Sequence, residues 1–92
     1  MWEDVTMINY KLYKSLPQSE QADILLEHGV YLELVRQTSR VEIELYALDG
    51  FYVEVYFDRR SEEPFYLKAF RNIRLLEPYL TVIDIEPLFQ LK

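Results

Sequence analysis

The chain has 92 residues, a length that suits one domain (residues 1–92) with a modest hydrophobic core. Half of the residues are hydrophobic and only two are glycine, so the composition is that of an ordered globular protein. The formal net charge of −6 argues against nucleic acid or an anionic membrane as a partner, and the lack of cysteine excludes disulfides and thiolate chemistry.

The N-terminus, residues 1–5, lacks the basic region followed by an apolar run that a signal peptide requires. No apolar stretch in the sequence approaches the length needed to cross a bilayer. We therefore expect a soluble, cytoplasmic protein.

Residues 4–14 fit two kinds of structure. Val5, Ile8 and Leu12 have the spacing of a helical stripe, whereas Ile8, Tyr10 and Leu12 alternate as in a short strand. We favour the helix for this segment.

A clearer helix is predicted over residues 16–28. Ser15 and Gln18 have the spacing of a capping box, and Pro17 falls in the first turn, where its missing N–H removes no helical hydrogen bond. Gly29 is expected to end the helix in a left-handed conformation. The buried stripe of this helix is predicted to contain Ala22, Leu25 and Leu26.

From Gly29 onward, apolar and polar residues alternate with a period of two, which is the pattern of half-buried strands. The pattern predicts strands at about 30–36, 41–47, 51–57 and 65–70. Because the connections between successive strands are short, we expect an antiparallel meander.

The register of the central hairpin depends on the turn at residues 49–50, an Asp-Gly pair that strongly favours a hairpin. A two-residue turn would pair Leu45 with Glu54 and so mix apolar and acidic side chains on one face. A loop of residues 48–50 instead pairs Leu45 with Val53 and gives the glycine the left-handed position of a bulged loop. We therefore predict the three-residue loop. The same matching of apolar residues pairs Leu34 with Ile43 and Tyr31 with Tyr46 on one side of the hairpin, and Val55 with Leu67 and Phe57 with Phe65 on the other.

In that register one sheet face is continuously apolar and has to be covered. We expect the N-terminal helices and a short C-terminal helix to cover it, giving an α+β fold with two layers. The helical spacing near the C-terminus involves Leu75, Leu76, Tyr79, Leu80 and Ile83, with Pro78 in the first turn. Ile85, Leu88 and Phe89 are expected to pack as a tail.

The other face of the predicted sheet carries aromatic and acidic side chains in rows that cross the strands. Cross-strand aromatic pairs stabilise a sheet by about 0.2–1 kcal/mol each without any partner, but this face has more of them than a solvated surface needs. Like charges in a row of glutamates destabilise a sheet unless Lys68 offsets the repulsion and the side chains splay into water, or a cationic group of a partner neutralises them. The predicted interaction face comprises Tyr31, Glu33, Glu42, Glu44, Tyr46, Tyr52, Glu54, Tyr56, Tyr66, Lys68 and Phe70.

No catalytic motif is visible, and we expect no enzyme activity and no cofactor. His28 is the only histidine and falls at the predicted end of a helix, where it would interact with the helix dipole. Carboxylates such as Glu42 and Glu44 would need a pocket that raises one pKa before they could act as acid and base. No loop has the oxygen ligands of a calcium or magnesium site, so no metal is expected.

The sequence thus favours a small protein-interaction module that uses the predicted interaction face. The expected partner is another protein or a second copy in a homodimer. The alternative is a domain that binds a small molecule or a cation on the same face.

Overall fold

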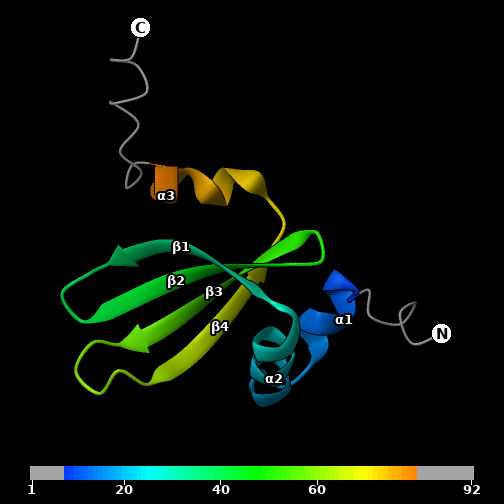
Figure 1. Cartoon of the computed structure of the whole chain (residues 1–92), viewed down its shortest axis with the longest axis horizontal. Coiled ribbons are helices and arrows are strands. Elements are labelled where there is room, and N and C mark those ends of the chain that lie inside the picture. The colour runs from blue at the N-terminus through cyan, green and yellow to red at the C-terminus, as the bar shows by residue number, and fades with distance from the viewer. Residues whose placement is uncertain (1–7, 81–92) are drawn as a thin grey trace, which may run out of the picture.

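The computed structural model describes residues 8–80 and shows an α+β fold with an open antiparallel sheet (Figure 1). The sheet has four strands in the order β1-β2-β3-β4, which confirms the predicted meander. The elements are α1 (Tyr10–Ser15), α2 (Gln18–His28), β1 (Val30–Gln37), β2 (Val41–Leu48), β3 (Phe51–Asp58), β4 (Pro64–Phe70), the 3₁₀ turn η2 (Ile73–Leu76) and α3 (Glu77–Leu80). Three predictions fall at least partly outside the described residues: the beginning of the helix favoured at 4–14, the helical position of Ile83, and the tail residues Ile85, Leu88 and Phe89.

The first two helices pack against each other through a buried tyrosine. Asn9 caps α1 by accepting a 3.1 Å hydrogen bond from the backbone N–H of Leu12, which agrees with the helix favoured for this segment. Tyr13 is fully buried, and its hydroxyl donates to the backbone oxygen of Gln21 in α2 at 2.7 Å.

None of the helices among residues 8–80 has the length and apolar character needed to cross a membrane.

Helix α2 starts at Gln18, but the predicted capping box does not form. Pro17 is the N-cap and makes no side-chain cap hydrogen bond. The Ser15 hydroxyl instead donates to the Leu12 carbonyl, and Gln18 reaches across to Leu67 in β4. The spacing of Ser15 and Gln18 matches a capping box, but the Gln18 side chain makes its hydrogen bonds to β4 instead.

The end of α2 also differs from the prediction. Gly29 has a φ of −76°, so it is extended and not left-handed. It is needed for a different reason, since a Cβ at this position would lie 2.7 Å from the carbonyl oxygen of Leu25. Of the predicted buried stripe, Leu25 is buried, Ala22 is half-buried and Leu26 is exposed.

The central hairpin has the two-residue turn, so the predicted register is wrong. Leu48 lies opposite Phe51 and Leu45 lies opposite Glu54. The turn residue Asp49 has a φ of 45° and Gly50 a φ of 89°, as a type I′ turn requires. This register places Glu54 on the same face as Leu45. The fold tolerates the buried carboxylate because Arg36 and Tyr79 donate hydrogen bonds to it.

The outer pairs of strands follow the predicted register over part of their length. Tyr31 pairs with Tyr46 as expected, but a bulge before Leu34 places that residue opposite Leu45 instead of Ile43. Between β3 and β4, the predicted pair of Val55 with Leu67 is present, whereas a second irregularity places Phe57 opposite Pro64 instead of Phe65.

The sheet separates two hydrophobic clusters, one on each face. The face covered by α1 and α2, called the α2 face below, has the buried residues Tyr13, Leu25, Leu48, Phe51, Val53, Val55 and Leu67 in its cluster. The opposite face, called the α3 face, has Ile43, Leu45, Phe70 and Tyr79. The C-terminal helix therefore does not share a face with the N-terminal helices as the predicted two-layer arrangement required; the order is helices, sheet, helix.

Candidate functional site

The residues of the predicted interaction face are divided between the two sides of the sheet. The changed register of the central hairpin is the cause, because a shift of one residue turns a strand over. The α2 face carries Tyr31, Glu42, Glu44 and Tyr46, and the α3 face carries Tyr52, Glu54, Tyr56, Tyr66, Lys68 and Phe70. Glu33 lies in the bulge of β1 with a φ of 61°.

The predicted rows of aromatic side chains across the sheet are present only as pairs of neighbouring rings. The rings of Tyr31 and Tyr46 lie 5.2 Å apart, and those of Tyr52 and Phe70 lie 5.6 Å apart on the other face. The row of glutamates is broken in the same way, since Glu54 faces away from Glu44. The six-aromatic patch expected on one surface is therefore absent from the described residues.

A groove on the α2 face is the most distinctive surface feature of the described residues. It lies between α2 and the β3–β4 half of the sheet and has a volume of about 410 Å³. Its walls include Ala22, Leu25, Leu26, Phe57, Phe65 and Leu67. Leu26 is 86% exposed and Phe65 is 59% exposed, so water meets large apolar side chains on both banks.

The width of the groove is fixed by Gln18. Its Oε1 accepts a hydrogen bond from the N–H of Leu67 at 2.7 Å, and its Nε2 donates to the carbonyl of the same residue at 3.1 Å. The amide thus bonds to the outer edge of β4 as the peptide group of a neighbouring strand would. Because β4 is an edge strand, this contact both ties α2 to the sheet and covers part of an open edge.

An acidic hollow adjoins the groove and shares Phe57 with it. The charged residues that line this hollow are Glu42, Glu44, Asp58, Arg59 and Glu62. The groove residue Tyr46 connects the two, because its hydroxyl donates to Oε1 of Glu44 at 3.1 Å. Burial, together with the charge of Glu44 beside it, raises the pKa of Tyr46 to about 12, so this phenol remains a neutral donor at neutral pH.

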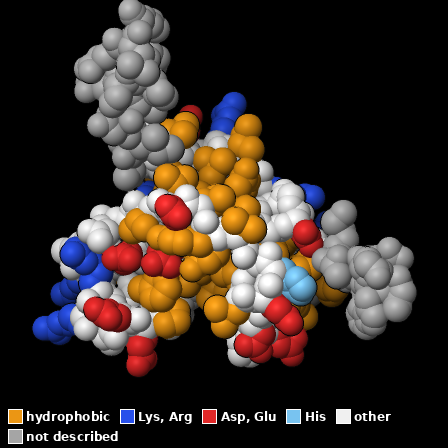
Figure 2. Space-filling view, in the orientation of Figure 1, with side chains coloured by type: hydrophobic (Ala, Val, Ile, Leu, Met, Phe, Trp, Pro, Cys, Tyr) orange, Lys and Arg blue, Asp and Glu red, His pale blue; other side chains and the backbone are white. Residues whose placement is uncertain are grey.

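The solvent-facing side of α2, which adjoins the groove, is acidic as well. Helix α2 carries Glu20, Asp23 and Glu27 on exposed positions and has no lysine or arginine. Asp23 precedes Leu26 by three residues, so the two side chains are neighbours on the helix surface. Figure 2 shows apolar side chains across the middle of this view, with acidic side chains on either side of them.

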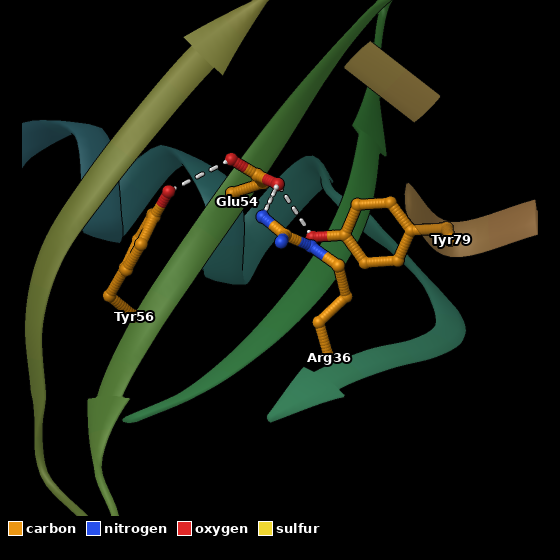
Figure 3. Close-up of polar contacts among 4 residues, drawn as sticks. All are labelled: Arg36, Glu54, Tyr56 and Tyr79. Atoms are coloured by element: carbon orange, nitrogen blue, oxygen red, sulfur yellow. Dashed lines mark hydrogen bonds and ion pairs between the residues drawn. The ribbon is translucent and has the colours of Figure 1, made fainter. Parts of the chain in front are cut away.

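A buried polar network lies on the α3 face and includes Glu54 and Tyr56, two residues that were predicted on an exposed interaction face (Figure 3). Oε2 of Glu54 accepts from Arg36 Nη2 at 3.1 Å and from the Tyr79 hydroxyl at 2.7 Å, and Oε1 accepts from the Tyr56 hydroxyl at 3.2 Å. The Arg36 guanidinium also lies 5.1 Å from the centre of the Tyr79 ring. Both oxygens of the carboxylate accept hydrogen bonds, so the network joins β1, β3 and α3.

Neither histidine chemistry nor a metal centre is organised in the described part of the chain. His28 occupies the last turn of α2, and its Nε2 lies 3.7 Å from Glu27 Oε1 on the surface. No group of three or more histidine, aspartate or glutamate side chains among residues 8–80 is placed to hold a metal ion.

Comparison of the chain with known protein families, with curated proteins and with solved structures finds no match in any of the three.

Proposed function

We propose that this chain is a small protein-interaction module that docks a segment of a partner protein in the groove between α2 and β4. The observation that carries the proposal is a preformed apolar channel bounded by Leu26 and Phe65, two large side chains that are mostly exposed. Burial of such side chains against a partner is the main source of affinity in protein interfaces.

The rigidity of the groove supports docking without rearrangement. Its floor is formed by strands β3 and β4, and Gln18 bonds α2 to β4 from one side. A preformed site loses less conformational entropy on binding, so a modest apolar contact can yield useful affinity.

A small apolar molecule is the second candidate occupant. The volume of about 410 Å³ falls in the range of ligand pockets, roughly 300–1,000 Å³. The exposure of Leu26 and Phe65 favours the polypeptide, because a ligand pocket usually encloses most of its ligand.

Photo-crosslinking from the groove tests the proposal. A benzophenone amino acid is placed at Leu26, and in a matched control at Leu12, a leucine of α1 that is 60% exposed and does not line the groove. In extracts of the native cell we expect discrete protein adducts from position 26, and their loss when Phe65→Gln is added. Equal labelling from both positions would contradict the proposal, and an adduct of twice the chain mass would identify a second copy as the occupant.

A further inference from the structure

We infer that the segment docked in the groove is basic, with a lysine or arginine close to its apolar anchor residue. This inference rests on the proposed function and names the chemistry of the partner. The groove walls themselves contain no charged side chain, so they provide apolar contact but no choice of charge. Selectivity for the charge of the partner comes from the surfaces beside the groove.

The surface on the sheet side is negative, and α2 adds no lysine or arginine on the other side. On the sheet side, four carboxylates and one guanidinium line the acidic hollow. On the helix side, α2 has no lysine or arginine, and its Asp23 is next to the groove residue Leu26, whereas Glu20 and Glu27 lie further round the helix. A cationic segment is attracted by the hollow, whereas an acidic segment would place like charges together at an interface, which is costly.

The hollow retains acceptors for a cation. Oε1 of Glu42 accepts from Gln37 Nε2 at 3.0 Å, and Oε1 of Glu44 accepts from the Tyr46 hydroxyl. The second oxygen of each carboxylate accepts no hydrogen bond from residues 8–80, and these oxygens can receive the N–H groups of lysine or arginine.

Arg59, the one cation of the hollow, is held elsewhere. Its Nη1 donates to the backbone oxygen of Thr38 at 2.7 Å, and no ion pair joins it to Glu42, Glu44 or Glu62 within the described residues. The negative charge of the hollow is therefore not neutralised by direct contact.

The spacing of the partner residues follows from the shared wall. Phe57 borders both the groove and the hollow, so an apolar anchor and a basic side chain are separated by the width of one side chain. An extended segment advances about 3.3 Å per residue, which places the two within roughly three positions of each other.

Selection from a phage-displayed library of random peptides on the full chain tests the inference. We expect the enriched peptides to combine a large apolar residue with lysine or arginine at this spacing. Affinities of these peptides are then measured by fluorescence anisotropy for the chain and its variants. Glu42→Gln with Glu44→Gln is expected to weaken binding about three- to tenfold, because two charge contacts are lost. The control, Glu33→Gln with Glu77→Gln, makes the same change of net charge at exposed positions outside the hollow and is expected to leave affinity unchanged.

The outcomes separate the inference from the proposed function. Peptides that bind through the groove without any basic preference, or equal affinities of the two double variants, would overturn the inference and leave the groove as the docking site. Peptides whose binding is unaffected by Leu26→Gln and by Phe65→Gln would overturn the inference and the proposed function together.

Discussion

The hydroxyl of Tyr79 donates a 2.7 Å hydrogen bond to Oε2 of Glu54, and both residues are almost completely buried. One residue belongs to the C-terminal helix and the other to the middle of β3, 25 positions earlier in the chain. Because Arg36 of β1 bonds to the same oxygen, one carboxylate links α3, an edge strand and a central strand. The short C-terminal helix is therefore held to the sheet by a polar contact as well as by apolar packing.

Loss of this contact is expected to destabilise the fold. Tyr79→Phe removes one donor to a buried charge and should lower the free energy of unfolding by about 1.5–3 kcal/mol. Urea denaturation followed by far-ultraviolet circular dichroism measures the change. Tyr66→Phe is the control, since Tyr66 is 46% exposed and its hydroxyl makes no hydrogen bond within the described residues. An equal effect of the two substitutions would show that the Tyr79 hydroxyl contributes nothing special.

A second prediction concerns the edge of β4. Gln18→Ala leaves the N–H and carbonyl of Leu67 without their partner, and we expect a loss of about 1–3 kcal/mol together with self-association at high concentration. Chemical denaturation and light scattering report the two effects. Gln37→Ala, which removes only an exposed contact to Glu42, should change stability by less than about 0.5 kcal/mol and leave the chain dispersed. If both variants behave alike, the amide of Gln18 does not protect this edge.

The two glycines are expected to respond differently to substitution. Gly50 has a φ of 89° and open space around it, so Gly50→Ala should cost about 1–2 kcal/mol through backbone strain alone, and Gly50→Asn should recover part of this loss. At Gly29 the obstacle is the Leu25 carbonyl, so Gly29→Asn should be no better tolerated than Gly29→Ala. Thermal melting of the four variants compares them. Recovery by asparagine at Gly29, or its absence at Gly50, would contradict the explanation given for that position.

The sequence was sufficient to predict the secondary structure and the order of the strands. Alternation over β1 to β4 is strong, and short connections leave an antiparallel meander as the simple arrangement. The predicted register of the central hairpin is wrong because it keeps Glu54 away from apolar residues. Arg36 and Tyr79, which lie far from it in sequence, supply the charge and the donor that allow it to be buried.

The groove could not be predicted from the sequence, for a different reason. Its existence depends on the position of α2 over the sheet, which leaves Leu26 exposed and is fixed by a bond from Gln18 to β4. Local periodicity places Leu26 and Leu25 on one stripe and cannot tell which of them meets the sheet. The acidic residues Glu42 and Glu44 were anticipated as part of a binding surface, and they do lie together beside the groove.

The last prediction concerns stability at alkaline pH. Burial raises the pKa of Tyr13 to about 12, and burial with the charge of Glu44 raises that of Tyr46 to about 12. Burial and the hydrogen bond to Glu54 raise the pKa of Tyr79 as well. In the unfolded chain a tyrosine ionises near pH 10, so between about pH 10 and pH 12 the folded state binds more protons than the unfolded state. The stability from these groups is complete below about pH 10 and should fall as the pH rises through this interval.

The free energy of unfolding in urea, measured at intervals from pH 8 to pH 11.5, tests this dependence. Absorbance at 295 nm reports phenolate formation in the same samples. Lysines also titrate in this range, so Tyr13→Phe isolates one tyrosine: it loses the hydrogen bond to Gln21 at every pH, but its stability should decline less steeply above pH 10 than that of the unaltered chain. Parallel pH profiles for the two proteins would contradict the assignment of the decline to buried phenols.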